Sequence, residues 1–351
     1  MNDSRKISLD ILRIIAAFSV VMLHVYGNLI YRYPVGTFNF NGANFIDSLN
    51  RFGVPIFVMI SGALFLDKSR KSDVKRLWLH NILRLAVIYV LWSVIYYLFA
   101  TDAGPKAVLE GKTLAQNIEG ILHADSYLWF FLMLMVVYAL SPVLKKWTEG
   151  ASRKDVEYYL ILFIVFNVVM ETVVTLADSY TVSEIARKLY LGSFIGYLGY
   201  FVLGYYFANY EISAKMRKFL YISVPFDIAL NYLSSRYMTQ KTGAYHPGVY
   251  DSFGLFTLLE TAALFLFVTS TFGKVNSAGT GTKILQSISK DTLGVYLLHE
   301  LFINKTEIFR TIVYGRFPLL WAVVYAIALF IITALISEVL RRLPFAGKYI
   351  C

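Results

Sequence analysis

The strongest constraint on this chain is a series of long apolar stretches. About ten runs of roughly 17 to 25 residues are apolar enough to cross the hydrocarbon core of a bilayer as α-helices. The 351 residues are 57% hydrophobic and 16% charged, whereas soluble domains carry roughly 25% charged residues. Soluble folds are therefore excluded, and the sequence predicts an all-α, polytopic integral membrane bundle. The predicted helices centre on residues 11–29, 52–66, 82–100, 127–144, 157–177, 191–208, 218–234, 253–271, 291–304 and 317–339.

Lysine and arginine are distributed unevenly between the predicted loops. With the N-terminus placed in the cytoplasm, about 20 of them fall in inner segments and about 10 in outer segments, as the positive-inside rule requires. This bias predicts about ten transmembrane helices with both termini cytoplasmic. The net charge of +10 is then explained by loops that face anionic lipid headgroups, and nucleic acid is not an expected partner.

The chain is predicted to form a single membrane domain over residues 1–351. No loop is long enough for a separate soluble domain, and there is no obvious internal repeat. Cys351 is the one cysteine, so we expect no disulfide framework and no metal site. The first apolar run is too long for a cleavable signal peptide and is expected to remain as the first helix.

Two ionisable residues interrupt that first run, which reads LDILRIIAAFSVVMLHVY at residues 9–26. Arg13 lies near its cytoplasmic end, and His24 lies about 16 Å deeper in a helix that rises about 1.5 Å per residue. The separation is close to three helical turns, so both side chains project from one face and are expected to line one groove. Arg13 can instead snorkel to lipid phosphate, and His24 can satisfy a polar site between helices. An in-line pair of costly ionisable groups favours a functional face.

The same stretch resembles the opening of the membrane acyltransferase 3 family, with Leu9, Asp10, Leu12, Arg13 and His24 at the matching positions. Three further stretches agree in order. RFGVPIFVMISGALFL is similar to the family's second-helix signature, through Arg51, Pro55, Phe57, Ser61 and Gly62. LWFFLMLMVVYALSPVL is similar to the fourth-helix signature, through Trp129, Phe130, Tyr138 and Pro142. DTLGVYLLH is similar to the late-helix signature, through Gly294, Tyr296 and His299.

The resemblance implies an integral membrane acyltransferase of the bacterial inner membrane. Such an enzyme takes an acyl group, here expected to be acetyl, from cytoplasmic acyl-CoA. It delivers the group to a hydroxyl of a lipid-linked glycan or surface polysaccharide. Within the family the chain looks most like the short members that O-acetylate surface glycans and lack an appended hydrolase-like domain.

The implied chemistry assigns expected roles to several residues. Arg13, with Lys75 and Arg76 of the basic loop DKSRKSDVKR at residues 67–76, suits the phosphates of CoA. Positive-inside topology alone is the other explanation of that loop. His24 is expected to be catalytic, either as a general base or as a transient acyl carrier.

Two departures from the family pattern affect these assignments. The Arg-x-x-Arg pair that often enters the third helix is reduced here to Arg84, with Asn81 at the partner position. Lys75, Arg76 or His80 is the expected substitute. Tyr127 stands where the fourth-helix signature often has histidine, before Leu128 and the matching Trp129.

The remaining intramembrane polar residues are weaker candidates. Glu171 and Glu260 either orient a histidine or pair with Arg84, and Asp227 either lines the cavity or satisfies backbone groups freed by Pro225. His299, adjacent to Glu300, is interpreted as a structural residue that supports the site. Two rival functions are a proton-coupled exporter of a small polar solute and a membrane scaffold without catalysis. The absence of matching broken helices in two halves argues against the first, and His24 argues against the second.

Overall fold

The computed structural model describes residues 3–70, 73–99, 105–123, 126–189, 191–273, 275, 279–304, 307–343 and 347. These residues contain no strand, so the prediction of an all-α protein is confirmed. Its first half consists of α1 (Asp3–Arg32), α2 (Phe38–Ser48), α3 (Gly53–Phe65), α4 (Val74–Arg76), η1 (Leu77–Ile82), α5 (Leu83–Leu98), α6 (Pro105–Leu109), α7 (Leu114–Leu122), η2 (Ser126–Leu128) and α8 (Trp129–Gly150). Its second half consists of α9 (Arg153–Phe163), η3 (Ile164–Val169), α10 (Met170–Ala177), α11 (Tyr180–Leu189), α12 (Leu191–Asn209), α13 (Ala214–Thr242), α14 (Leu255–Phe272), α15 (Thr280–Asn304), α16 (Glu307–Val313) and α17 (Pro318–Arg342).

Seven helical segments among the described residues are long and apolar enough to cross a membrane, so a multi-pass membrane protein is confirmed. They are Ile7–Arg32, Phe38–Phe65, Val74–Leu98, Trp129–Gly150, Arg153–Ala177, Leu255–Phe272 and Pro318–Arg342. The other three predicted spans are also helices, α12, α13 and α15, but lie outside this set. The count of ten and the position of the termini remain predictions.

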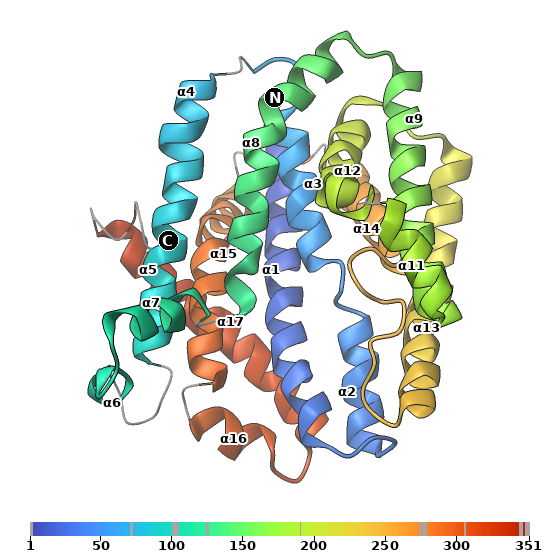
Figure 1. The fold of residues 1–351 in the computed structure, drawn as a ribbon. Coiled ribbons are helices and arrows are strands. Elements are labelled where there is room, and N and C mark those ends of the chain that lie inside the picture. Colours follow the sequence, from blue (N-terminus) through green and yellow to red (C-terminus); the bar gives the residue numbers. More distant parts are fainter. Residues whose placement is uncertain are drawn as a thin grey trace.

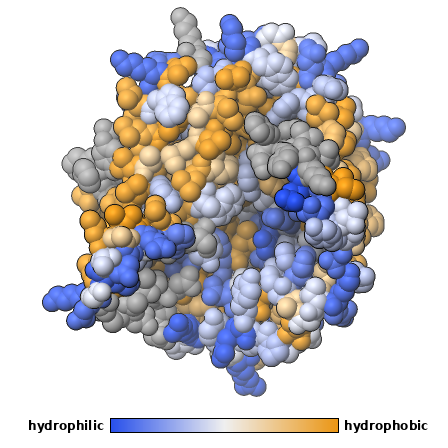
Figure 2. Space-filling view, viewed as in Figure 1, coloured by the Kyte–Doolittle hydropathy of each residue, from blue (hydrophilic) through white to orange (hydrophobic). Residues whose placement is uncertain are grey.

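The connections alternate between two ends of the bundle (Figure 1). The α3–α4 and α8–α9 connections lie at the end where α1 begins, and the α1–α2 connection and α16 lie at the opposite end. At the end where α1 begins, a capping box starts α9: the Ser152 hydroxyl accepts from the Asp155 amide at 3.3 Å, and the Asp155 carboxylate accepts from the Ser152 amide at 2.8 Å. Figure 2 shows the molecule from the same side as Figure 1. Hydrophobic residues dominate the upper left of this face, whereas hydrophilic residues line its upper and lower edges and a hollow near its centre.

Helix α1 lies at the centre of the bundle and packs against α2, α3, α14, α15 and α17. Leu12, Val21, Val25 and Leu29 of α1 are fully buried in this packing. Because α1 is surrounded by helices, Arg13 and His24 in its middle face other protein groups and cavities.

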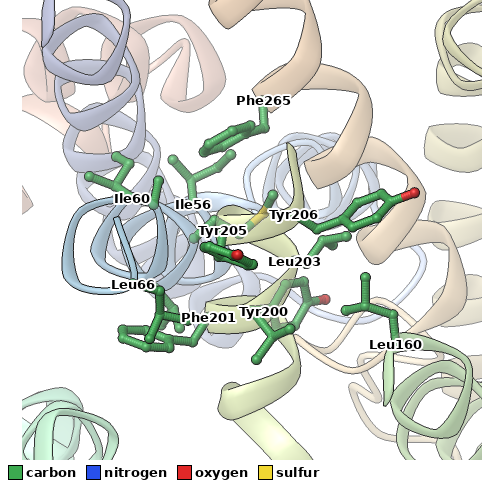
Figure 3. Packing of buried hydrophobic residues seen from close by; sticks show 14 of the residues in the cluster. Ile56, Ile60, Leu66, Leu160, Tyr200, Phe201, Leu203, Tyr205, Tyr206 and Phe265 are labelled. Atoms are coloured by element: carbon green, nitrogen blue, oxygen red, sulfur yellow. The ribbon is translucent and has the colours of Figure 1, made fainter. Parts of the chain in front are cut away.

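Helices α3 and α12 approach each other backbone to backbone, through two glycines. A Cβ atom on Gly62 would lie 1.7 Å from the Phe201 carbonyl oxygen, and one on Gly204 would lie 1.9 Å from the Met59 carbonyl oxygen. Close approach at small residues is the usual way in which membrane helices gain packing energy. Ile56, Ile60, Phe201 and Tyr205 fill the core around this contact (Figure 3).

The second predicted span, residues 52–66, differs in the structure. The apolar segment is Phe38–Phe65, and it is broken into α2 and α3 at residues 49–52. Just after α2 ends, the side-chain amide of Asn50 donates to the Ile46 carbonyl at 2.7 Å. Helix α3 then begins at Gly53, which packs closely against Ser19 and Ala16 of α1. Arg51 therefore stands at a helix break, next to the site described below.

Candidate functional site

Three ionisable side chains from the two ends of the sequence meet where α1 crosses α15. His24 Nδ1 lies 2.5 Å from His299 Nε2 and 3.2 Å from Glu300 Oε1, and His299 Nε2 lies 3.9 Å from the same oxygen. The two imidazole rings stack with centroids 4.8 Å apart and planes 7° from parallel. His299 and Glu300 are buried, whereas the His24 side chain is 18% exposed.

The hydrogen bonds of this cluster determine which nitrogen of His24 is basic. His299 Nδ1 lies 3.1 Å from the Val295 carbonyl oxygen, which only accepts, so Nδ1 carries the proton and His299 Nε2 carries a lone pair. His24 Nδ1 must then donate to His299 Nε2. The lone pair of neutral His24 is consequently on Nε2, which is hydrogen-bonded to no described residue. A carboxylate beside Nδ1 of a base-acting histidine stabilises the imidazolium that forms when Nε2 takes a proton.

Tyr127 forms another wall of the cluster. Its ring lies 4.2 Å from the His24 ring, centroid to centroid, at a tilt of 54°. The side-chain amide of Asn28 donates to the His24 carbonyl at 2.9 Å, one turn further along α1. The position that departs from the family's fourth-helix signature is thus in direct contact with the candidate base.

His24 opens into a cavity of about 510 Å³, which we call the histidine chamber. Six aromatic side chains line it, Tyr31, Tyr127, Trp129, Tyr197, Tyr245 and Tyr296, together with the polar residues Asn28, Asp47, Arg51, Asp251 and Ser252. Trp129 and Tyr197 lie side by side, with ring centroids 5.7 Å apart.

Arg51 is held in place on the wall of the histidine chamber by the broken helix. Its guanidinium pairs with Asp47 one turn earlier, lies 3.4 Å from the Tyr245 hydroxyl and covers the Tyr250 ring at 4.6 Å from its centroid. Burial and the nearby Asp47 carboxylate raise the pKa of Tyr245 and Tyr250, which lie in the loop that precedes α14, so both phenols stay neutral.

Arg13 lines a different cavity of about 600 Å³, the arginine chamber. Its wall also contains Asp10, Ser61, His80, Asn81, Arg84, Tyr138, Gln286, Ser289 and Lys290. The expectation that Arg13 and His24 line one groove is therefore wrong. Both project from one face of α1, but they line separate cavities whose walls share Tyr296 of α15. Asp10 pairs with Arg13 at 2.8 Å and accepts from the Ser289 hydroxyl at 2.7 Å, which ties α1 to α15.

A third cavity of about 620 Å³ adjoins the arginine chamber, and the two share Leu64, Phe65 and Asn81 in their walls. We call it the basic vestibule, because Arg70, Arg76 and Lys145 line it. Lys145 is 3% exposed, and its ammonium group donates to the carbonyls of Asp67 and Arg70. Lys75 is exposed and lines none of these cavities. Residues 71–72 of the predicted basic loop lie outside the described residues.

The three intramembrane carboxylates chosen from the sequence lie away from His24. Glu171 is exposed on α10. Glu260 and Asp227 are buried on the adjacent helices α14 and α13, near enough for their charges to repel, and Asp227 accepts from the Ser223 hydroxyl at 2.7 Å. Glu260 lines a separate apolar cavity with Ile15 and Phe52. None of the three contacts the histidine cluster.

His24, His299 and Glu300 are also the described residues that have the right groups to hold a metal ion, with ligand atoms all within 4.8 Å of one another. Two nitrogens bound to one tetrahedral zinc ion at about 2.0–2.1 Å lie roughly 3.3 Å apart. The two imidazole nitrogens lie closer together than that, at 2.5 Å, as a hydrogen-bonded pair. The arrangement fits a hydrogen-bonded base better than a metal centre.

Sequence reasoning singled out His24 but not the group that supports its charge. Glu300 was noted only as the neighbour of a structural His299. It lies close to His24 because α1 and α15 cross, although His24 and His299 are 275 residues apart in the sequence. The one local signal was a histidine and a glutamate side by side in an apolar run.

The comparisons with known proteins give one match. The model of the acyltransferase 3 family, described as an acyltransferase domain, matches residues 6–338. No curated protein and no solved structure matches the chain.

Proposed function

Because the chain belongs to the membrane acyltransferase 3 family, we propose that it transfers an acetyl group from cytoplasmic acetyl-CoA to a hydroxyl of a lipid-linked or surface glycan. The observation that supports this most is the hydrogen-bond chain from Val295 through His299 to His24, which leaves a basic nitrogen facing an aromatic chamber. An acyltransferase activity follows from the family; the donor, the acceptor and the bacterial inner membrane are part of the proposal.

The donor is proposed to bind across the basic vestibule and the arginine chamber. Arg70 and Arg76 of the vestibule suit the nucleotide phosphates, because guanidinium groups form charge-assisted hydrogen bonds with phosphate oxygens. The pantetheine arm then extends into the arginine chamber past Arg84 and Arg13. In this arrangement the basic end of the bundle is cytoplasmic, in agreement with the lysine and arginine bias.

The acceptor is proposed to bind in the histidine chamber. Tyr127, Trp129 and Tyr197 offer flat apolar faces that suit the C–H faces of a sugar ring, and Asp47, Arg51 and Asp251 offer hydrogen bonds to its hydroxyls. A cavity with aromatic walls and a few convergent polar groups is the usual form of a small-molecule site.

The reaction requires one proton transfer in each direction. His24 Nε2 removes the proton from the acceptor hydroxyl, whose oxygen attacks the thioester carbonyl carbon. The C–S bond breaks, the ester forms, and the CoA thiolate takes the proton from His24 to leave as the thiol. The negative charge of Glu300, whose Oε1 lies 3.2 Å from His24 Nδ1, stabilises the intermediate imidazolium while Nδ1 keeps its bond to His299. If His24 instead accepts the acetyl group itself, the same Nε2 is the nucleophile and an acetyl-imidazole precedes the ester.

The test is acetyl transfer by the purified full-length chain in lipid nanodiscs. Radiolabelled acetyl-CoA and extracted lipid-linked glycans are supplied, and free CoA thiol and labelled glycan are both measured. We expect both products from the wild type and from His123→Ala, because His123 is exposed and contacts only the Glu119 carbonyl. His24→Ala is expected to release neither.

The rival function is transport. The break between α2 and α3 and the presence of cavities at different depths would also suit a transporter. A transporter would release no CoA thiol from acetyl-CoA, with or without glycan. Absence of thiol release from folded wild-type protein across donor chain lengths and glycan acceptors would reject the proposed function in favour of this rival.

A further inference from the structure

One side chain, Tyr296 on α15, belongs to the walls of both the histidine chamber and the arginine chamber. No other described residue lines both cavities. It lies one helical turn before His299, with the two rings 5.8 Å apart between centroids. The residue that stands between the two cavities is therefore adjacent to the candidate base.

The Tyr296 ring is held by contacts on several sides and is 8% exposed. Its hydroxyl donates to the Tyr127 carbonyl at 2.5 Å. Phe130 and Phe131 of α8 pack against the ring with centroids 5.3 and 5.7 Å away. The bond to Tyr127 joins α15 to the short helix η2, whose Tyr127 ring also contacts His24.

We propose that Tyr296 is the partition between the two chambers and that it limits the size of the acyl group that can reach His24. The size limit rests on the proposed acyltransferase function, whereas the partition does not. The walls of the two chambers meet at Tyr296, so a donor that extends past Arg13 reaches His24 beside this ring. The thioester can meet the acceptor only beside the Tyr296 ring, so the space between this ring, Phe130 and His24 determines how much acyl chain fits.

This placement has a chemical consequence for the donor. A two-carbon acyl group needs little room beyond the thioester, but each further methylene must occupy space that the Tyr296 and Phe130 rings already fill. One methylene too many in a close-fitting apolar site costs roughly 10- to 200-fold in kcat/KM. The partition therefore favours acetyl over longer acyl donors, and it keeps water in the two chambers separate between turnovers.

The partition is tested by thiol labelling, which requires no acyl transfer. In a Cys351→Ser background, Gly27→Cys reports on the histidine chamber and Gln286→Cys on the arginine chamber. Gly27 is suitable because a Cβ there meets no atom within 4 Å. Each variant is treated with a membrane-impermeant maleimide in right-side-out and in inside-out vesicles. We expect each cysteine to react from one face only, and from opposite faces.

Tyr296→Ala should abolish this sidedness, with at least a tenfold faster reaction of Gly27→Cys from the face that labels Gln286→Cys. Tyr296→Phe is the matched control, because it keeps the ring and removes the hydroxyl that donates to Tyr127, and it should label as the parent does. Tyr296→Leu replaces the alanine variant if the latter is not monodisperse. Labelling of the parent from both faces, or unchanged sidedness in the alanine or leucine variant, would overturn the partition.

The size limit is tested on the same proteins with acetyl-, butyryl- and hexanoyl-CoA. Tyr296→Ala should raise the ratio of kcat/KM for hexanoyl-CoA to that for acetyl-CoA by about tenfold or more, and Tyr296→Phe should leave it unchanged. An unchanged ratio in Tyr296→Ala would reject the size limit. If no variant and no wild type transfers any acyl group, the proposed function fails and the size limit with it, whereas the labelling result still decides the partition.

Discussion

Arg13 and His24 project from one face of α1 and yet line two different cavities. The helical periodicity that places them in line is correct, but the two cavities are separate and share Tyr296 of α15 in their walls. This relationship separates the residue proposed to bind the donor from the residue proposed to activate the acceptor. The two substrates can then approach the reaction from opposite ends of the bundle and meet near its middle.

Arg13→Ala should raise the KM for acetyl-CoA by about tenfold and change the KM for the acceptor little, since a charge-assisted hydrogen bond contributes about 1.5–3 kcal/mol. Arg13→Lys should recover part of the loss, because the positive charge beside Asp10 remains. Lys75→Ala is the control, since Lys75 is exposed and lines no chamber. Steady-state kinetics with each substrate varied in turn provide the measurement. A rise confined to the acceptor KM would place Arg13 outside the donor site.

Glu300→Gln should lower kcat by about 10²- to 10⁴-fold with little change in either KM. The amide keeps the shape of the side chain but does not stabilise the imidazolium on His24, whose Nδ1 lies 3.2 Å from Glu300 Oε1. Glu171→Gln should be silent, because that carboxylate is exposed on α10 and contacts none of the cluster. Wild-type kcat in Glu300→Gln would mean that His24 acts without the carboxylate.

The fold class was readable from the sequence, because apolar runs of about 20 residues can satisfy their backbone groups in a bilayer only as helices. His24 was also readable, since an ionisable group deep in a span is costly and marks function. Glu300 was not, because its role depends on the crossing of α1 and α15, which no local pattern encodes. Residues Glu171, Glu260 and Asp227 were chosen by the same cost argument. The structure places Glu260 and Asp227 in the interior on α14 and α13, away from His24, and leaves Glu171 exposed.

Chelation of divalent metal ions should leave acetyl transfer within about twofold of its starting rate. The two imidazole nitrogens at 2.5 Å are closer than two ligands of one zinc ion, which lie roughly 3.3 Å apart. The measurement is turnover after dialysis against a chelator, followed by addition of Zn²⁺, Mn²⁺ or Mg²⁺. Loss of activity that one of these ions restores would assign the cluster to a metal.

Gly62→Ala should lower the thermal stability of the protein in detergent, because its Cβ would lie 1.7 Å from the Phe201 carbonyl oxygen. Overpacking of this kind typically lowers the free energy of unfolding by about 1–3 kcal/mol. The clash here is with backbone atoms, which cannot move aside as a flexible side chain can. Gly150→Ala is the matched control, since a Cβ there meets nothing within 4 Å. Thermal unfolding followed by intrinsic fluorescence should show a clearly lower midpoint for the first variant and an unchanged one for the second. Equal midpoints would mean that α3 and α12 lie further apart.

The orientation of the bundle decides whether the basic vestibule can receive CoA from the cytoplasm. Lysine and arginine bias predicts that Lys146 lies inside and that Lys112 and Lys241 lie outside. In the structure the end of α8 lies at one end of the bundle, and the α6–α7 connection and the end of α13 lie toward the other (Figure 1). Cysteines are placed singly at these three positions in a Cys351→Ser background and treated with an impermeant thiol reagent on intact cells. We expect labelling at 112 and 241 only. All three lysines are exposed, so each thiol will be accessible from its own side of the membrane. Labelling at 146 would turn the vestibule outward, and the donor site proposed there would then be inaccessible to cytoplasmic acyl-CoA even if His24 proved essential.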